Sequence, residues 1–140
     1  MLKNVRQYLI QWGDCDPAGI VFYPRYFEMF DHSTTLLISA ASGLTKYQLL
    51  KEYDAAGYPM VDTRAKFAIP TRFGDTVTIT SAFTTVGTSS FDVHHTISKD
   101  GKLCLEGFET RVWVGKDPSD PSKIKSKPIP EDLAARFRGK

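Results

Sequence analysis

The spacing of apolar positions changes once along this chain, from three or four residues to two. Between residues 25 and 42 apolar side chains recur at the interval of a helical turn, which predicts a helix with one buried face. Pro24 fits the first turn of this helix, because its missing N–H costs nothing there, and Gly43 fits its C-cap. A second, shorter helix is predicted over 46–54.

From residue 61 the period is two and the composition is rich in β-branched and aromatic residues, which predicts strands. Strands are expected at 5–12, 61–69, 76–86, 90–97 and 103–114. An Asp-Gly turn at 99–102 joins the last two, and a bulge is expected at Gly107. Residues 115–129 are rich in Pro, Lys and Ser and are expected to form a loop, followed by a short helix at 131–138.

This order of elements predicts an antiparallel sheet with a helix packed on one face, which is an α+β layout. At 140 residues the chain is expected to form one domain over 1–140. A single long helix leaves the edges and the other face of a five-stranded sheet incompletely buried. Self-association is therefore expected.

Composition argues against several classes of protein. The net charge of +2 is too small to favour a nucleic-acid partner, and no apolar run is long enough to predict a membrane span. The N-terminus has no apolar signal core, so a cytoplasmic location is expected. No Cys/His spacing is typical of a metal site, and His94 and His95, as neighbours on a strand, should point to opposite faces.

Asp16 is the strongest chemical candidate, because it lies in a turn-rich loop that leads into the long helix. A carboxylate near a helix N-terminus can act on an electrophile whose developing oxyanion is held by free backbone N–H groups, which suits acyl transfer. Asp16 before Pro17 is equally a common turn former. Asp31, about two helical turns into the helix, also reads as a solvated acid paired with a neighbour.

The segment 13–21, GDCDPAGIV, is followed by Tyr23, Pro24 and Tyr26. Together these residues resemble the signature of the 4-hydroxybenzoyl-CoA thioesterase family of hotdog-fold proteins. The resemblance covers essentially the whole chain, because the order of strand, helix and strands also matches. It implies a curled antiparallel sheet around one long helix, a homodimer or homotetramer joined through sheet edges, and active sites at the subunit interface.

The resemblance also implies roles for single residues. Asp16 matches the catalytic carboxylate, which acts as nucleophile on the thioester carbonyl or as general base for a water. The backbone N–H of Tyr23 matches the oxyanion donor. Asp31 matches the acid that reaches the hydroxyl of a 4-hydroxybenzoyl group, and Gly19 and Pro24 belong to the substrate-binding segment. Coenzyme A is part of the substrate, so no separate cofactor is expected.

One turn departs from the family pattern. Where relatives carry a basic cluster for the phosphates of CoA, residues 87–90 read GTSS, so Ser89 and Ser90 offer only neutral donors. The phosphate contacts are then expected on basic groups elsewhere: Arg64, Lys66, Arg72 or the C-terminal tail. The thioester carrier stays open between CoA and the phosphopantetheine arm of a carrier protein.

The expected activity is hydrolysis of an acyl-CoA thioester, with an aromatic acyl group of the 4-hydroxybenzoyl kind. One alternative is a non-catalytic acyl-CoA-binding protein, which needs no carboxylate at position 16. Another is a thioesterase for aliphatic or carrier-protein-linked acyl groups. A third is a hotdog dehydratase, whose chemistry requires a His beside Asp16.

Overall fold

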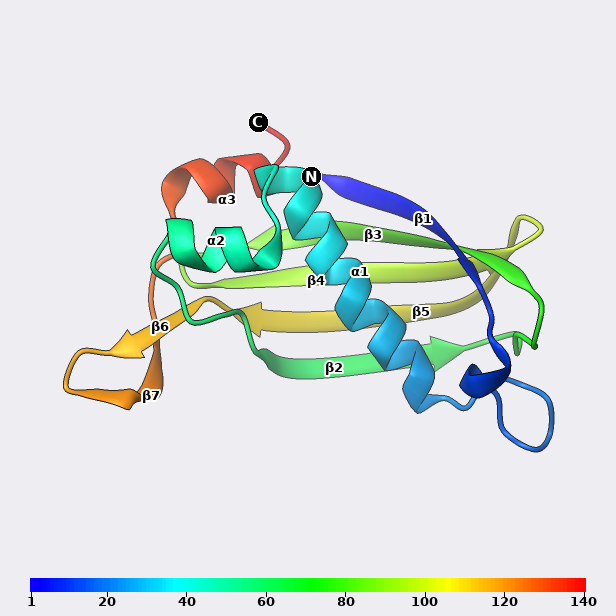
Figure 1. Ribbon diagram of the computed structural model, residues 1–140. Coiled ribbons are helices and arrows are strands. Elements are labelled where there is room, and N and C mark those ends of the chain that lie inside the picture. Colours follow the sequence, from blue (N-terminus) through cyan, green and yellow to red (C-terminus); the bar gives the residue numbers. More distant parts are fainter.

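A computed structural model describes all 140 residues as a five-stranded antiparallel sheet crossed on one face by a long helix (Figure 1). The strands are β1 (Lys3–Leu9), β2 (Met60–Phe67), β3 (Thr76–Val86), β4 (Ser90–Lys99) and β5 (Lys102–Val112). Their order in space is β1-β3-β4-β5-β2, so β1 and β2 are the edges of the sheet. The predicted α+β layout is confirmed.

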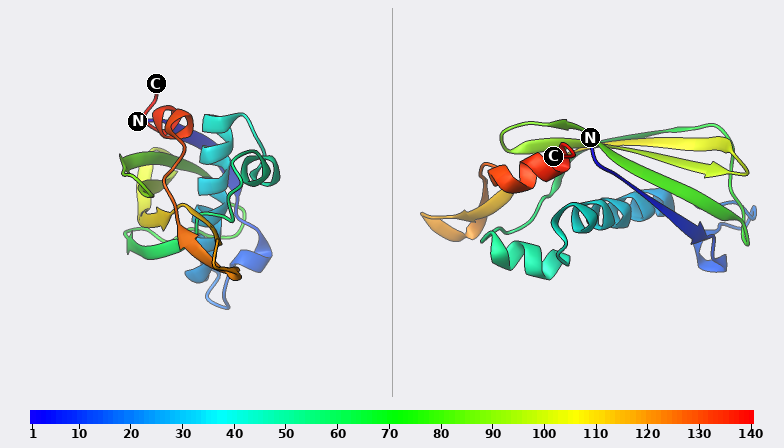
Figure 2. Two further views of the ribbon diagram at one scale, coloured as in Figure 1. Left: turned by 90° about the vertical axis from the view of Figure 1, so that its left-hand side faces the viewer. Right: turned by 90° about the horizontal axis from the view of Figure 1, so that it is seen from above.

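The long helix α1 (Pro24–Ser42) begins and ends where the sequence predicts. Pro24 occupies its first turn, and Gly43 ends it in the left-handed region, with φ 73° and its N–H donating to the carbonyl of Ser39 at 2.8 Å. Helix α2 (Lys46–Glu52) follows on the same side of the sheet and ends two residues before the predicted position (Figure 2).

Two apolar clusters fill the space between the sheet and the helices. One surrounds the first half of α1 and contains Phe30, Ile79 and Leu105. The other surrounds its second half and contains Leu37 and the buried residues of the C-terminal helix α3 (Glu131–Phe137). Both halves of the long helix are thus packed on the inner face of the sheet, and α3 adds to the core beside the second half.

The first strand ends earlier than predicted. Strand β1 stops at Leu9, and Trp12 lies in a short 3₁₀ turn, η1 (Trp12–Asp14), with its side chain exposed. The cause is Asp14, whose carboxylate accepts hydrogen bonds from the N–H of Gln11 at 2.8 Å and the hydroxyl of Tyr8 at 2.7 Å. These bonds turn the chain away from β3 and towards α1.

The expected loop over 115–129 is wrong, because most of this segment forms a hairpin. Strands β6 (Val114–Asp117) and β7 (Asp120–Ser126) pair beyond the end of the main sheet, coloured orange in Figure 1. The turn between them is stabilised by the carboxylate of Asp117, which accepts from the N–H and hydroxyl of Ser119. Strand β7 is almost wholly exposed, so no alternation of apolar residues marks it in the sequence.

The expected bulge at Gly107 is also wrong. Gly107 pairs in regular register with Ala65 on one side and His95 on the other, and the irregularity between β4 and β5 lies at Ile97/Ser98 instead. The reason for glycine is packing across the core. A Cβ built at position 107 would lie 2.4 Å from a ring carbon of Phe30 on α1, so only glycine lets the helix approach this closely.

We expect Gly107→Ala to lower the free energy of unfolding by about 1–3 kcal/mol, because the added methyl group forces the buried Phe30 ring to move. Denaturant unfolding of the two proteins measures the difference. Gly13→Ala is the matched control, since a Cβ there meets nothing within 4 Å. Equal stability of the parent and the Gly107 variant would contradict the close packing of α1 on the sheet.

Candidate active site

The loop between η1 and α1 folds back on itself and fixes Asp16. The N–H of Asp16 donates to the carbonyl of Ile20, and the N–H of Gly19 donates to the carbonyl of Asp16, both at 2.9 Å. Gly19 closes the turn in the left-handed region, at φ 82°. The side-chain Oδ1 of Asp16 accepts from the N–H of Ala18 at 2.9 Å. Its Oδ2 has no partner in the chain, so Asp16 forms the turn and still presents a free carboxylate oxygen.

The start of α1 leaves one backbone donor free. Arg25 donates to the carbonyl of Phe22 and Tyr26 to that of Tyr23, at 2.8 and 3.0 Å, but the N–H of Tyr23 has no acceptor in the chain. The first turn contains no acidic residue that would offset the positive end of the helix dipole. This N–H can therefore receive the oxygen of an anion or of a developing oxyanion.

Thr71 joins the loop and the helix start to the segment between β2 and β3. Its carbonyl accepts from the N–H of Val21 at 2.9 Å, and its hydroxyl pairs with that of Tyr26 at 2.7 Å. Burial raises the pKa of Tyr26 despite these hydrogen bonds, so its phenol stays neutral. Asp16 and the N–H of Tyr23 are thus held on one fixed frame.

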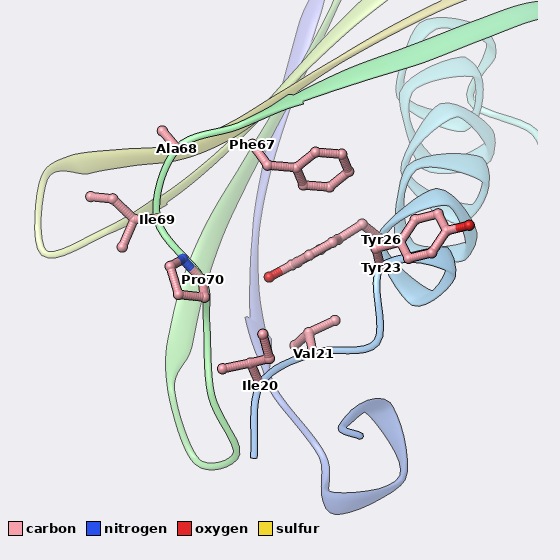
Figure 3. Close-up of a pocket in the computed structure, with 8 residues that line it drawn as sticks. All are labelled: Ile20, Val21, Tyr23, Tyr26, Phe67, Ala68, Ile69 and Pro70. Carbon is pink, nitrogen blue, oxygen red and sulfur yellow. The ribbon is translucent and has the colours of Figure 1, made fainter. Parts of the chain in front are cut away.

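An apolar pocket of about 250 Å³ opens beside this frame (Figure 3). Its walls come from the loop, the helix start, and the end of β2 with the residues that follow it: Ile20, Val21, Tyr23, Tyr26, Phe67, Ala68, Ile69 and Pro70. Asp16 itself does not line it, but its backbone is bonded to Ile20, which does. The Phe67 and Tyr26 rings, 6.0 Å apart, make this a suitable place for a flat apolar group.

Asp31 lies outside this pocket. It is eight residues after Tyr23 on the same helix, about 12 Å further along the axis. Its side chain is 63% exposed, and its Oδ1 accepts from Nη2 of Arg111 at 2.8 Å. The interpretation of Asp31 as a solvated acid paired with a neighbour agrees with this geometry, although the neighbour comes from β5. One chain alone does not bring Asp31 to the pocket.

Ser89 and Ser90 are far from Asp16 within the chain. Ser89 lies in the turn after β3, where its carbonyl accepts from the N–H of Trp113 at 2.7 Å, and Ser90 begins β4. The Asp16 loop is bridged to Arg72, just before β3 begins. The length of β3, about 30 Å or more, therefore separates the two sites.

The predicted basic residues do not gather around the Asp16 loop. Arg64 and Lys66 lie over the Phe108 ring, with the Arg64 guanidinium 4.0 Å from its centroid. The intervening position faces the other way, and Phe67 turns into the pocket on the α1 side. Of the predicted cations, Arg72 is the one whose backbone is bridged to the Asp16 loop, at Ile20.

A buried polar network under α1 was not expected from the sequence. Glu109 accepts from the hydroxyl of Thr34, from Nε2 of His95 and from Nε of Arg111, the last at 2.6 Å. Nδ1 of His95 pairs with the hydroxyl of Ser81 at 2.7 Å. A signal was present, because the period of two places His95, Glu109 and Arg111 on the core face of β4 and β5.

His94 and His95 point to opposite faces, as predicted. His94 pairs with Glu106 on the outer face at 3.0 Å, whereas His95 is buried under α1. No hydrogen-bond partner of His95 belongs to the Asp16 loop, so the geometry gives the dehydratase alternative no support.

No group of three or more His, Cys, Asp or Glu side chains is arranged to hold a metal ion. No helix combines the length and apolar character needed to span a membrane.

Comparison with known proteins identifies the superfamily of this chain. A model of the thioesterase-like superfamily matches residues 10–137, and the chain belongs to that superfamily. The 4-hydroxybenzoyl-CoA thioesterase of Pseudomonas sp. (strain CBS-3) is 28% identical over 131 residues, which cover 90% of this chain and 91% of that protein. The resemblance to the 4-hydroxybenzoyl-CoA thioesterase family, and with it the expected class of thioester hydrolase, is confirmed.

Solved structures of relatives agree. A 4-hydroxybenzoyl-CoA thioesterase with an Asp-to-Asn substitution, complexed with 4-hydroxybenzoyl-CoA, superposes with a TM-score of 0.89 at 25% identity, covering 98% of this chain and 99% of its own. A gentisyl-coenzyme A thioesterase superposes with a TM-score of 0.80 at 29% identity, covering 93% and 98%. The predicted hotdog fold is therefore confirmed.

The buried Glu109 predicts a dependence of stability on pH. Burial raises the pKa of Glu109, but the hydrogen bond and electrostatic effect of His95 and the charge of Arg111 together lower it below its ordinary value. A carboxylate with a lowered pKa stabilises the fold fully above the unfolded-state pKa, about 4.3. That contribution is lost as the pH falls through the lowered value.

We expect Glu109→Gln to lower the free energy of unfolding at pH 7 by about 3–5 kcal/mol, because Arg111 keeps its charge without its buried partner. The difference from the parent should begin to shrink below about pH 4.3, where the unfolded parent takes up a proton at Glu109, and it should be lost as the pH falls through the lowered pKa of the folded state. Denaturant unfolding across pH 3–7 measures both effects. Glu106→Gln is the control on the outer face, with an expected loss of less than about 1 kcal/mol.

Proposed function

We propose that this chain hydrolyses an acyl-CoA thioester whose acyl group is a hydroxylated aromatic ring. The observation that carries the proposal is that one frame beside an apolar pocket holds two unused groups. These are a free carboxylate oxygen of Asp16 and the free backbone N–H of Tyr23. Two relatives support the choice of acyl group, because they are named for 4-hydroxybenzoyl-CoA and gentisyl-CoA.

The chemistry follows from these two groups. Asp16 Oδ2 attacks the thioester carbonyl, or takes a proton from a water that attacks it. The carbonyl oxygen gains a negative charge, which the N–H of Tyr23 and the positive end of α1 stabilise. Collapse of this intermediate expels the thiolate of CoA. In the nucleophilic route water then hydrolyses the mixed anhydride at Asp16 and releases the free acid.

We also propose that a second copy of the chain completes the site. Strand β2 is an unpaired edge with exposed side chains, and the pocket lies at its end. A second copy that pairs along this edge covers the pocket. Asp31 lies on the same side of the molecule, because its partner Arg111 is the cross-strand neighbour of Met60 on β2. A homodimer paired along β2 therefore brings side chains from the α1 helices of both copies, Asp31 among them, towards the pocket.

We expect Asp16→Asn to reduce thiol release from aromatic acyl-CoA esters by about 10²–10⁴-fold, because the amide is neither a base nor a nucleophile of comparable strength. Asn retains an oxygen that accepts from the N–H of Ala18, so the melting temperature should stay within a few degrees of the parent's. A spectrophotometric thiol assay measures the rate. Asp14→Asn, two residues away, is the matched control and should change the rate by only a few-fold.

Tyr23→Pro tests the oxyanion donor, because proline lacks the backbone N–H and Tyr23 already has a φ of −53° that proline adopts. We expect this variant to lose about 10²–10³-fold in kcat. Tyr23→Ala removes the same side chain from the pocket wall but retains the N–H, so its loss in kcat should be much smaller than that of Tyr23→Pro. Equal losses in the two variants would show that the side chain matters rather than the N–H.

The parent itself decides between hydrolysis and mere binding. If it binds aromatic and aliphatic acyl-CoA esters but releases no thiol from any of them, the chain is a binding protein. Release from aliphatic esters alone, or from carrier-protein thioesters alone, would contradict the proposed acyl group or carrier.

A further inference from the structure

Asp31 has one oxygen bound and one oxygen free. Its Oδ1 accepts from Nη2 of Arg111 at 2.8 Å, and its Oδ2 has no partner in the chain. The side chain is 63% exposed, so the free oxygen can be reached by a ligand. An exposed aspartate on a helix is otherwise free to rotate, and the bond to Arg111 restricts it to one orientation.

Arg111 is itself held rigidly. Its side chain is only 5% exposed, and it donates from Nε to Glu109 at 2.6 Å and from Nη1 to the carbonyl of Tyr58 at 3.3 Å. The guanidinium also lies 5.7 Å from the centroid of the Tyr58 ring. With Nε bound to Glu109 and Nη1 bound to the carbonyl of Tyr58, the orientation of the planar group is fixed, and its Nη2 donates to Asp31.

A second layer of contacts fixes Glu109. Its Oε1 accepts from the hydroxyl of Thr34 and from His95, whose ring stacks on Phe30 with centroids 4.7 Å apart. Phe30 precedes Asp31 on α1, and Thr34 follows it by one turn. The network therefore ties the stretch of helix around Asp31 to the middle of the sheet.

We infer that Arg111, held by Glu109, is a positioning residue that aims the free oxygen of Asp31 at the ring hydroxyl of the acyl group and so sets the selectivity for hydroxylated rings. This inference rests on the proposed function and on the proposed pairing of two copies along β2, because one chain alone does not bring Asp31 to the pocket. Its physical basis is preorganisation, since a carboxylate that is already oriented loses little conformational freedom when it accepts a hydrogen bond from the substrate.

The test compares 4-hydroxybenzoyl-CoA with benzoyl-CoA in Arg111→Lys, with Arg6→Lys as matched control. Lysine keeps the positive charge but cannot donate to three partners in one plane. Arg6 also fastens α1 to the sheet, through the hydroxyl of Ser33 at 2.9 Å and the carbonyl of Met29 at 3.0 Å, without contacting Asp31.

We expect the ratio of kcat/KM for the two esters to fall about tenfold or more in Arg111→Lys, and kcat/KM for benzoyl-CoA to change less than about threefold. The ratio should be unchanged in Arg6→Lys. Asp31→Asn should show the same loss of selectivity, and Arg111→Lys should add little to it in the double variant. If Arg111→Lys does not fold, Glu109→Asp, which retracts the anchor of Arg111, should lower the ratio in its place.

Equilibrium binding of both esters in the Asp16→Asn background separates this inference from the proposed function. Hydroxyl-selective binding that depends on Arg111, with no turnover by the parent, overturns the proposed hydrolysis and supports the positioning role. Turnover with no preference for the hydroxylated ring overturns the positioning role alone. An equal loss for both esters in Arg111→Lys also overturns it, because a purely structural role affects the two substrates alike.

Discussion

Helix α1 can lie where it does because Gly107 has no side chain beneath the ring of Phe30. This contact sets the height of the helix above the sheet, and His95 stacks against the same ring. Both positions on the helix and at its start for which we propose a function, Tyr23 and Asp31, depend on that height. Tyr23 must meet the loop that carries Asp16, and Asp31 must meet Arg111 from the sheet below. The packing of one aromatic ring on one glycine thus helps to position both of these residues.

Asp16 and Asp31 are oriented in the same way. In Asp16 a backbone N–H binds one oxygen, and in Asp31 an arginine does so, while the second oxygen of each is free. Each carboxylate is thereby oriented without being fully satisfied, which is the state in which it can act on a ligand at little entropic cost. The free N–H of Tyr23 completes the set, because it is a donor where the carboxylates are acceptors.

Much of the fold could be predicted, because its signals are local. Pro24 and Gly43 delimit α1, and the period of two marks the four strands after residue 60. The hairpin of β6 and β7 was not predicted, since an exposed strand carries no alternation of apolar residues. Gly107 was misread as a bulge because its reason lies across the core, in Phe30.

The candidate site, like the fold, could be predicted only in part from the sequence. Asp16, Gly19 and Tyr23 could be grouped because they lie within one short segment. Ser89 could not be placed relative to them without the sheet order, which sets it at the other end of β3. The period of two places His95, Glu109 and Arg111 on the core face, but the pairing of residues from α1 and three strands around Glu109 appears only in the folded chain.

The double attachment of Arg111 has an evolutionary consequence. Its guanidinium is shared between an acid that supports the core, Glu109, and an acid that faces outward, Asp31. Replacing Asp31 therefore also removes a counter-charge from a buried cation. Under the selectivity role that we infer for Asp31, a lineage that replaces this acid loses some stability unless the core changes in the same step, so changes at 31 and 111 should arise together.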